Sequence, residues 1–298
     1  MKITIIGPGN VGLSIAYALI LRESVSELVM IGIEKESLIA RDLELGQSIA
    51  ALNLDIKLTC TEEYSYSKDS DIVIFCAGVA RKDGQSRDEL LQTNKEIMLK
   101  CAKQIKRYVE NPLFIILTNP VDSLLNVLYE SHLFDSKKII AMAGTLDNAR
   151  FKYELAKKFK CKSFDIDTKL IGFHNDDMVL LKSLSTCKNE KISTLLNEEE
   201  FEDIENEVKT GGAKVIKHLK ASAYLAPAAA CVRMIEGIRT REFLPMSVIL
   251  HGEFGVHNKA FGVLARLSLD GVLEVLPLNL NEAEKLSIEK SLIKYKYI

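Results

Sequence analysis

The sequence has little that would tie it to a membrane or a nucleic acid. Its 298 residues carry a formal net charge of -2 at pH 7, so no cationic surplus is available to attract a polyanion or an anionic bilayer. No apolar run approaches the roughly 20 residues of a membrane-spanning helix. The apolar run at residues 2–6 is short and ends in glycines, so we expect no signal peptide. These absences favour a cytoplasmic protein without membrane or nucleic-acid partners.

Paired cysteines and metal-binding spacings are also missing. The six cysteines occur singly, without a C-x-x-C pair, at Cys60, Cys76, Cys101, Cys161, Cys187 and Cys231. This usage is typical of reduced, packed cysteines and argues against a disulfide framework. The five histidines are dispersed, with no H-E-x-x-H motif. We therefore expect no bound metal.

The most informative segment present is the N-terminus. The β-branched run at residues 2–6 breaks into Gly7-Pro8-Gly9-Asn10-Val11-Gly12 and then into a helix-like run at 13–20. In this G-x-G-x-x-G spacing, Gly7 permits a sharp turn, Gly9 leaves room for a pyrophosphate, and Gly12 lets the helix pack on the strand. The helix N-terminus offers free N–H groups to the phosphates. The alternative is a tight strand-to-helix turn without a ligand, which this context disfavours.

The first half of the chain alternates strands and helices. Apolar runs predict strands at 3–6, 28–31, 56–60, 72–77, 114–118 and 138–141, with helices between them that include 35–52 and 88–109. Near-continuous apolar strands suit a parallel sheet covered on both faces. We therefore predict an α/β fold in which a doubly wound parallel sheet forms a dinucleotide-binding domain, residues 1–142.

The second half changes character and predicts an α+β domain, residues 143–298. Strands are expected at 168–173, 178–185, 246–251 and 261–269, and a closing helix at 281–292. A long amphipathic segment at 198–220 contains Gly211-Gly212, where we expect a kink or a break. An Ala-rich helix is expected at 221–238, with Pro227 as its kink.

Polar residues at four places could carry chemistry. Arg81 and Arg87 lie in a glycine-containing loop after the fourth strand, where they could face an anionic ligand or remain solvated. Asn119 ends the fifth strand, although Asn before Pro is also a common turn signal. Asp147 and Arg150 share a helix face, and in isolation such a pair is a surface ion pair worth under ~1 kcal/mol. His174 lies between two strands and needs a carboxylate partner to act, for which Asp147 is one candidate.

Taken together, these segments resemble the lactate/malate dehydrogenases that use a nicotinamide dinucleotide. The resemblance covers nearly the whole chain and includes the glycine turn, 80–82, 86–87, 118–122, 147–151, His174, 222–228 and 252–255. It implies hydride exchange between (S)-malate and the cofactor, giving oxaloacetate, as in the tricarboxylic acid cycle. It also implies a homodimer or homotetramer.

The resemblance assigns roles residue by residue. It makes His174 the proton acceptor and donor, Asp147 its orienting partner, and Arg150 the ligand of the carboxylate beside the reacting carbon. Arg87 would polarise the reacting oxygen, and Asn119 would contact both that oxygen and the cofactor. The remaining cofactor contacts are Gly7, Gly9, Asn10, Val11, Gly12, Gly32, Asn94, Leu117 and Thr118.

Arg81 matches the position that distinguishes substrates in the family, where lactate-specific members tend to carry an uncharged residue. Its planar guanidinium can bind a second carboxylate in two-pronged fashion. Such a contact favours malate over lactate by ~10- to 100-fold. The alternatives are a dehydrogenase of another 2-hydroxy acid, such as lactate, and a non-catalytic dinucleotide-binding module.

Two departures from the family pattern stand out. The carboxylate expected after the second strand, which would hold the ribose hydroxyls of NAD, is replaced by Gly32. This replacement could admit NADP, but Glu34 could reach the ribose instead, so NAD is favoured. Beside His174, Phe173 and Asn175 stand where the family commonly has glycine, and they could reshape the walls of the site.

Overall fold

The computed structural model describes residues 1–79 and 87–297, without the side chains of 87 and 88. The largest sheet among these residues has nine strands in the order β14-β13-β12-β6-β5-β4-β1-β2-β3. The six strands that come first along the chain are mutually parallel. They are β1 (Lys2–Ile6), β2 (Glu27–Ile31), β3 (Lys57–Thr61), β4 (Ile72–Phe75), β5 (Leu113–Ile116) and β6 (Ile139–Ala141). The predicted α/β fold with a parallel N-terminal sheet is confirmed.

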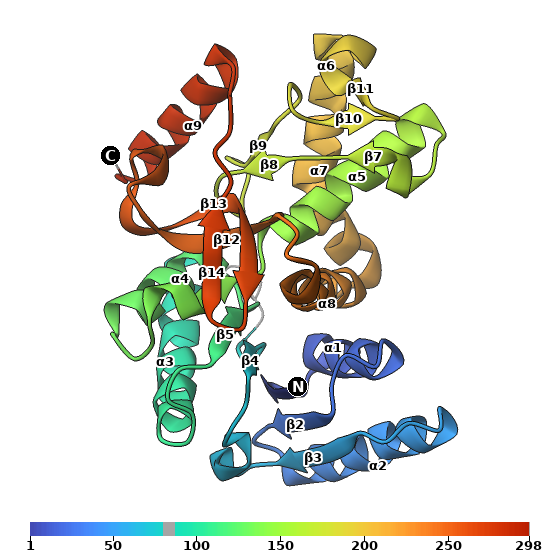
Figure 1. Cartoon of the computed structure of the whole chain (residues 1–298), viewed down its shortest axis with the longest axis vertical. Helices are drawn as coiled ribbons and strands as arrows, with labels where there is room; N and C mark the ends of the chain where they lie inside the picture. Colours follow the sequence, from blue (N-terminus) through green and yellow to red (C-terminus); the bar gives the residue numbers. More distant parts are fainter. Residues whose placement is uncertain (80–86, 298) are drawn as a thin grey trace.

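Helices cover both faces of the parallel sheet (Figure 1). They are α1 (Asn10–Leu21), α2 (Lys35–Ala51), α3 (Arg87–Lys106) and α4 (Val121–Glu130). Neighbouring residues of β1 enter opposite hydrophobic clusters, because successive side chains of a strand point to opposite faces. Ile5 packs in the cluster that contains Ile15 of α1, and Ile6 in the cluster that contains Met98 and Leu124. Both faces are therefore buried, as the continuous apolar strands predict.

Strands from the second half extend this sheet. β12 (Leu244–His251) pairs antiparallel with β6, and β13 (His257–Ser268) and β14 (Gly271–Val275) follow it. Small sheets are formed by β7 (Ile166–Asp167), β10 (Thr186–Cys187) and β11 (Glu190–Lys191), and by β8 (Leu170–Ile171) with β9 (Val179–Leu180). The helices are α5 (Gly144–Phe159), α6 (Ile192–Leu195), α7 (Glu198–Leu219), α8 (Leu225–Thr240) and α9 (Glu282–Lys294).

Two predicted helix irregularities are wrong. The helix α7 runs unbroken through Gly211 and Gly212. Both glycines lie against the Arg150 side chain, which the absence of a Cβ allows to come close. Pro227 produces no mid-helix kink, since α8 begins at Leu225 and places the proline in its first turn. A proline there interrupts no intrahelical hydrogen bond.

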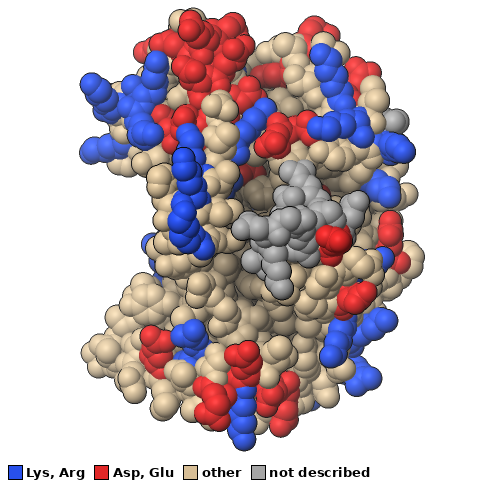
Figure 2. Space-filling view, turned by 180° about the vertical axis from the view of Figure 1, so that it is seen from behind, with Lys and Arg blue, Asp and Glu red and all other residues tan. Residues whose placement is uncertain are grey.

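The surface carries charges of both signs, and the cysteines are unpaired. Basic and acidic side chains both occur on the face shown in Figure 2, in keeping with the net charge of -2. All six cysteines are free thiols, although the Sγ atoms of Cys161 and Cys187 lie 3.7 Å apart.

Over the described ranges, no helix is long and apolar enough to span a bilayer. No metal-ligating cluster of His, Cys, Asp or Glu occurs in that part of the chain either.

Candidate active site

The glycine turn joins β1 to α1 at the carboxyl edge of the sheet. A Cβ on Gly12 would lie 2.1 Å from the carbonyl oxygen of Gly7, so only glycine lets α1 approach the strand this closely. Gly7 has φ of 103°, and its Cβ would lie 2.6 Å from the Ala77 nitrogen. A Cβ on Gly9 would meet nothing within 4 Å. The glycine turn therefore leaves open space at the N-terminus of α1, and the first turn of that helix carries no charged side chain. This open space fits a pyrophosphate.

Asn94 ties together the loops that follow β4 and β5. Its side-chain amide donates to the carbonyl of Asn119 at 2.8 Å and accepts the N–H of Val79 at 2.9 Å. The Thr118 hydroxyl donates to the carbonyl of Ala77 at 2.8 Å, which adds a second link. Asn94, at the centre of this network, is only 1% exposed. It fixes Asn119 at the strand end where the sequence places it.

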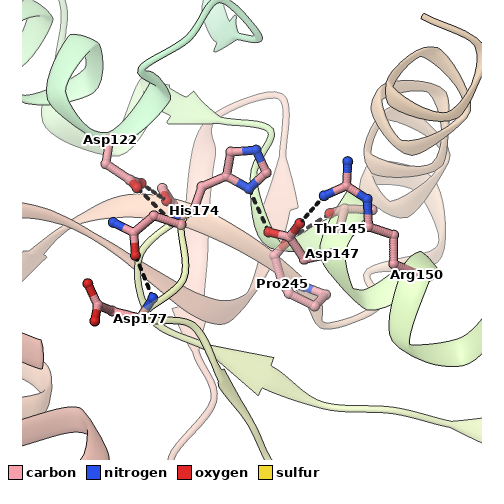
Figure 3. Close-up of polar contacts among 9 residues, drawn as sticks. Asp122, Thr145, Asp147, Arg150, His174, Asp177 and Pro245 are labelled. Atoms are coloured by element: carbon pink, nitrogen blue, oxygen red, sulfur yellow. Dashed lines mark hydrogen bonds and ion pairs between the residues drawn. The ribbon is translucent and has the colours of Figure 1, made fainter. Parts of the chain in front are cut away.

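Asp147, Arg150 and His174 meet at one point (Figure 3). Oδ2 of Asp147 lies 2.6 Å from Nδ1 of His174, and Oδ1 accepts from Nη1 of Arg150 at 2.8 Å. The start of α5 is anchored because the Thr145 hydroxyl donates to the carbonyl of Pro245 in β12 at 2.6 Å. Asp147 is therefore held in the first turn of α5, 1% exposed. The structure brings together residues that the sequence separates by 27 positions.

The environment raises the pKa of His174. Burial of the ring lowers that pKa, but the Asp147 carboxylate raises it through its charge and its hydrogen bond, and Asp122 adds to this effect. The carboxylates together outweigh burial and the nearby Arg150 cation. The imidazolium is thus favoured relative to an isolated histidine. Such a ring can hold or release a proton close to neutral pH.

Asp122 and Ser247 are contacts of the site that sequence reasoning missed. Oδ2 of Asp122 accepts the backbone N–H of His174 at 2.8 Å, and the Ser247 hydroxyl donates to Oδ1. Burial raises the pKa of the Asp122 carboxyl, and these hydrogen bonds oppose the rise. The available signal was the position of Asp122 in the first turn of a helix at the sheet edge, next to Asn119. Its partners come from elements far away in the chain.

Two adjoining cavities meet at His174. One, of about 460 Å³, is lined by residues that include Asn119, Asp147, Arg150 and His174. The other, of about 630 Å³, is lined by residues that include Gly78, Thr118, Asn119 and His174. Val11, in the first turn of α1, lines both. The two cavities therefore lie between the first turn of α1 and the Asp147–His174 pair. Arg81 lies outside the described residues, as does the side chain of Arg87.

Both halves of the chain match models of one protein family. Residues 1–141 match the NAD binding domain of lactate/malate dehydrogenase, and residues 144–296 match the alpha/beta C-terminal domain of the same family. The chain belongs to the lactate/malate dehydrogenase family. It is 70% identical to a probable malate dehydrogenase of Campylobacter jejuni, over 100% of this chain and 99% of that protein. It is 36% identical to the malate dehydrogenase of Aliarcobacter butzleri, over 99% of this chain and 95% of the relative.

Solved structures of the family have the same fold. The malate dehydrogenase of Aeropyrum pernix superposes with a TM-score of 0.94 at 30% identity, covering 99% of this chain and 96% of that one. A lactate dehydrogenase of Eimeria maxima, solved with NADH and oxamate, gives a TM-score of 0.92 at 27% identity. It covers 99% of this chain and 92% of the other. Both substrate classes of the family therefore share this backbone.

Gly32 marks where this member of the family departs from the expected dinucleotide site. A Cβ on Gly32 would lie 2.7 Å from Cγ of Pro8 and 3.1 Å from Cδ2 of Leu38. The proline ring of the glycine turn thus packs against the position at which an acidic residue was expected. The next residue, Ile33, is 90% exposed. A side chain at position 32 would therefore have to displace the Pro8 ring.

Proposed function

We propose that this protein is a malate dehydrogenase that exchanges a hydride between C2 of (S)-malate and a nicotinamide dinucleotide. The observation that carries the proposal is the Asp147–His174–Arg150 arrangement in a cavity that Asn119 also lines. An imidazole next to a buried carboxylate is a proton acceptor and donor, and an arginine beside it is a ligand for a substrate carboxylate. The relatives named above support the assignment of malate as the substrate.

In this proposal His174, Asp147 and Arg150 have distinct roles. Asp147 engages Nδ1 of His174, which leaves Nε2 to take the proton of the malate hydroxyl. As the O–H and C2–H bonds break, a carbonyl forms, and oxaloacetate results. The nicotinamide dinucleotide, when bound, accepts the hydride. In the reverse direction the imidazolium of His174 returns the proton. Arg150 uses Nη1 for Asp147 and retains its other donors for the carboxylate beside the reacting carbon.

The family resemblance completes the substrate contacts. Arg87 polarises the reacting oxygen, Asn119 contacts it, and Arg81 binds the second carboxylate of malate. A buried carboxylate requires a cationic partner, and Arg81 is the residue that distinguishes malate from lactate in this proposal. Residues 1–142 hold the cofactor and residues 143–298 supply Asp147, Arg150 and His174.

The cofactor in this proposal is NAD. The contacts are the glycine turn with Asn10 and Val11, the edge residues Asn94, Leu117, Thr118 and Asn119, and the backbone at Gly32. Glu34, which is exposed at the N-cap of α2, replaces the missing acid as ligand of the ribose hydroxyls. A role in the tricarboxylic acid cycle and a cytoplasmic location are further predictions from the family resemblance.

A homodimer or homotetramer is also part of the proposal. Tyr17 and Leu21 of α1 are 44% and 49% exposed, and Leu225 of α8 is 68% exposed. These side chains line one hollow between α1, α2 and α8. Apolar surface gathered in this way is typical of a surface that a second subunit covers. Light scattering after size-exclusion chromatography tests this assembly.

One assay tests the proposed function. NADH oxidation by the purified protein is followed with oxaloacetate and with pyruvate, and each reaction is repeated with NADPH. We expect oxaloacetate and NADH to give the highest kcat/KM. The His174→Asn variant should bind NADH but lose turnover. Equal rates with pyruvate would assign a broader 2-oxo acid specificity, and NADH binding without turnover of any substrate would indicate a non-catalytic module.

A further inference from the structure

The C-terminal segment, residues 294–297, packs against the His174 loop, residues 173–177. The Phe173 ring centroid lies 4.5 Å from that of Tyr295 and 5.0 Å from that of Tyr297. Phe261 of β13 contacts the same ring edge-to-face at 5.1 Å. Phe173 is 3% exposed. The large side chain that replaces the expected glycine therefore fits into an aromatic cluster that the end of the chain supplies.

Polar contacts hold the other side of the loop. Nδ2 of Asn175 donates to the Tyr295 hydroxyl at 3.0 Å, and that hydroxyl donates to Oδ2 of Asp177 at 2.7 Å. Nζ of Lys294 also lies 2.7 Å from the Asp177 carboxylate. The Asp177 N–H donates to Oδ1 of Asn175 at 2.8 Å. Both residues that depart from the family pattern thus contact the same segment, one on each side of His174.

The segment is also fixed to the helix that carries Asp122. Nδ2 of Asn126 in α4 donates to the Tyr297 hydroxyl at 2.7 Å, while Oδ1 of Asn126 accepts the N–H of Ala260 at 2.7 Å. Asp122, from the first turn of α4, accepts the N–H of His174. The C-terminal segment therefore contacts both the His174 loop and α4, the helix that holds the His174 N–H through Asp122.

Tyr295 and Tyr297 also line the cavity that Asn119 and His174 line. Burial raises the pKa of Tyr297 to about 12, so its hydroxyl stays protonated wherever the enzyme is assayed. A change in the pH profile of a variant in this region therefore does not come from ionisation of Tyr297.

We propose that Tyr295 and Tyr297 are positioning residues for His174, acting through Phe173 and Asn175. The inference rests on the proposed function, since it assigns His174 as the base. A base works only when it is held close to its productive geometry, and displacements near 1 Å reduce the rate strongly. In this chain the glycine-rich backbone expected around the histidine is replaced by two larger residues, and the C-terminal tyrosines provide the surface on which they rest.

Tyr295→Phe tests the proposal because it keeps the ring and removes only the hydroxyl. We expect kcat for oxaloacetate reduction to fall by up to about tenfold, because the variant loses the hydrogen bonds of the Tyr295 hydroxyl that hold the His174 loop. NADH affinity should not change. The apparent pKa of His174 in malate oxidation should fall, because a displaced His174 imidazole pairs less well with Asp147. Tyr297→Phe should act in the same direction. Tyr66→Phe, at a tyrosine that is 49% exposed, is the matched control.

A double-mutant cycle separates positioning from simple stabilisation. If Tyr295 acts through Asn175, the double variant Tyr295→Phe/Asn175→Ala loses no more activity than the larger of the single losses. A variant with a lower Tm but with wild-type kcat and pH profile would overturn the proposal, as would fully additive losses. A wild-type protein that is inactive on malate and oxaloacetate would instead refute the proposed function.

Discussion

Nδ1 of His174 lies 2.6 Å from Oδ2 of Asp147, a carboxylate with 1% exposure. Burial lowers the pKa of the imidazole, but the carboxylates raise it further, and the folded value exceeds the usual value of about 6.5. The contribution of His174 to folding stability is therefore fully present below the unfolded pKa and is lost as the pH rises through the folded value. For catalysis, malate oxidation needs neutral His174 and oxaloacetate reduction needs the imidazolium.

The first prediction concerns this pair. Malate oxidation should increase with pH through the raised pKa of His174, and oxaloacetate reduction should decrease over the same range. In Asp147→Asn the charge that raises the pKa is gone, so both transitions should move to lower pH, with kcat reduced about a hundredfold or more. Profiles of kcat/KM against pH in both directions measure the shift. Asp203→Asn, at an exposed position of α7, should leave them unchanged; an unshifted Asp147→Asn profile would contradict the pairing.

The second prediction concerns the support of the His174 backbone. Asp122 accepts the His174 N–H, and Ser247 donates to the other oxygen of the same carboxylate. Asp122→Asn keeps the shape but removes a negative charge that favours the imidazolium, and it turns one acceptor into a donor. We expect about a tenfold loss of kcat and a lower apparent pKa in malate oxidation.

Ser247→Ala provides the comparison for Asp122→Asn. It removes a hydrogen bond to Asp122 but keeps the carboxylate charge, so its pH profile should stay close to wild type while kcat decreases modestly. Steady-state kinetics of both variants across pH distinguish the two effects. A shift of equal size in Ser247→Ala would show that geometry, and not the charge of Asp122, sets the apparent pKa.

The third prediction is that a substitution at Gly212 weakens substrate binding without reducing stability. A Cβ there would lie 3.2 Å from Nη2 of Arg150, so Gly212→Ala should displace the guanidinium and raise KM for oxaloacetate several-fold. Alanine in a helix interior is about 0.5–1 kcal/mol more favourable than glycine, so stability should hold or increase. Gly46→Ala in α2, where a Cβ meets nothing within 4 Å, should raise Tm without any change in KM. If both variants have wild-type KM, Arg150 does not bind the substrate in its present position.

Local pattern predicted the parallel sheet because its strands are apolar on both faces, and apolar runs are visible in the sequence. The same approach failed at Gly211-Gly212 and at Pro227, because helix propensity alone predicted a kink or break at both places. Arg150 supplies the reason for the glycines, and the start of α8 supplies the reason for the proline. Tertiary packing overrides propensity at the two glycines, whereas the effect of Pro227 is decided by its place in the first turn of α8.

Part of the site could be predicted only through the family resemblance. His174 and Asp147 are typical residue types for proton transfer, but their pairing across 27 positions has no local signal. The Ser247–Asp122 contact spans 125 positions and depends on β12 pairing with β6. Strand order at a sheet edge is not encoded in any short pattern. The tyrosines that contact Phe173 and Asn175 were missed for the same reason.

The last prediction concerns the ribose site. Restoring the expected acid with Gly32→Asp should not improve NAD binding, because a Cβ there would lie 2.7 Å from Cγ of Pro8. The side chain would displace the glycine turn, and Pro8 directly precedes Gly9, whose surroundings are open for the pyrophosphate. We expect NADH affinity to fall about tenfold, corresponding to about 1.4 kcal/mol, and Tm to decrease. Fluorescence titration and thermal unfolding measure the two effects.

The double variant Pro8→Ala/Gly32→Asp separates steric conflict from the chemistry of the acid. Removing the ring relieves the contact, so Tm should recover, and the new carboxylate should then favour NADH over NADPH by disfavouring a 2′-phosphate. Glu34→Gln in the wild-type background tests the role of Glu34. If Glu34 binds the ribose hydroxyls, this variant should bind NADH more weakly, and the difference between its affinities for NADH and NADPH should become smaller. Tight NADH binding by Gly32→Asp at unchanged Tm would show that Pro8 yields, and that the missing acid is not excluded by packing.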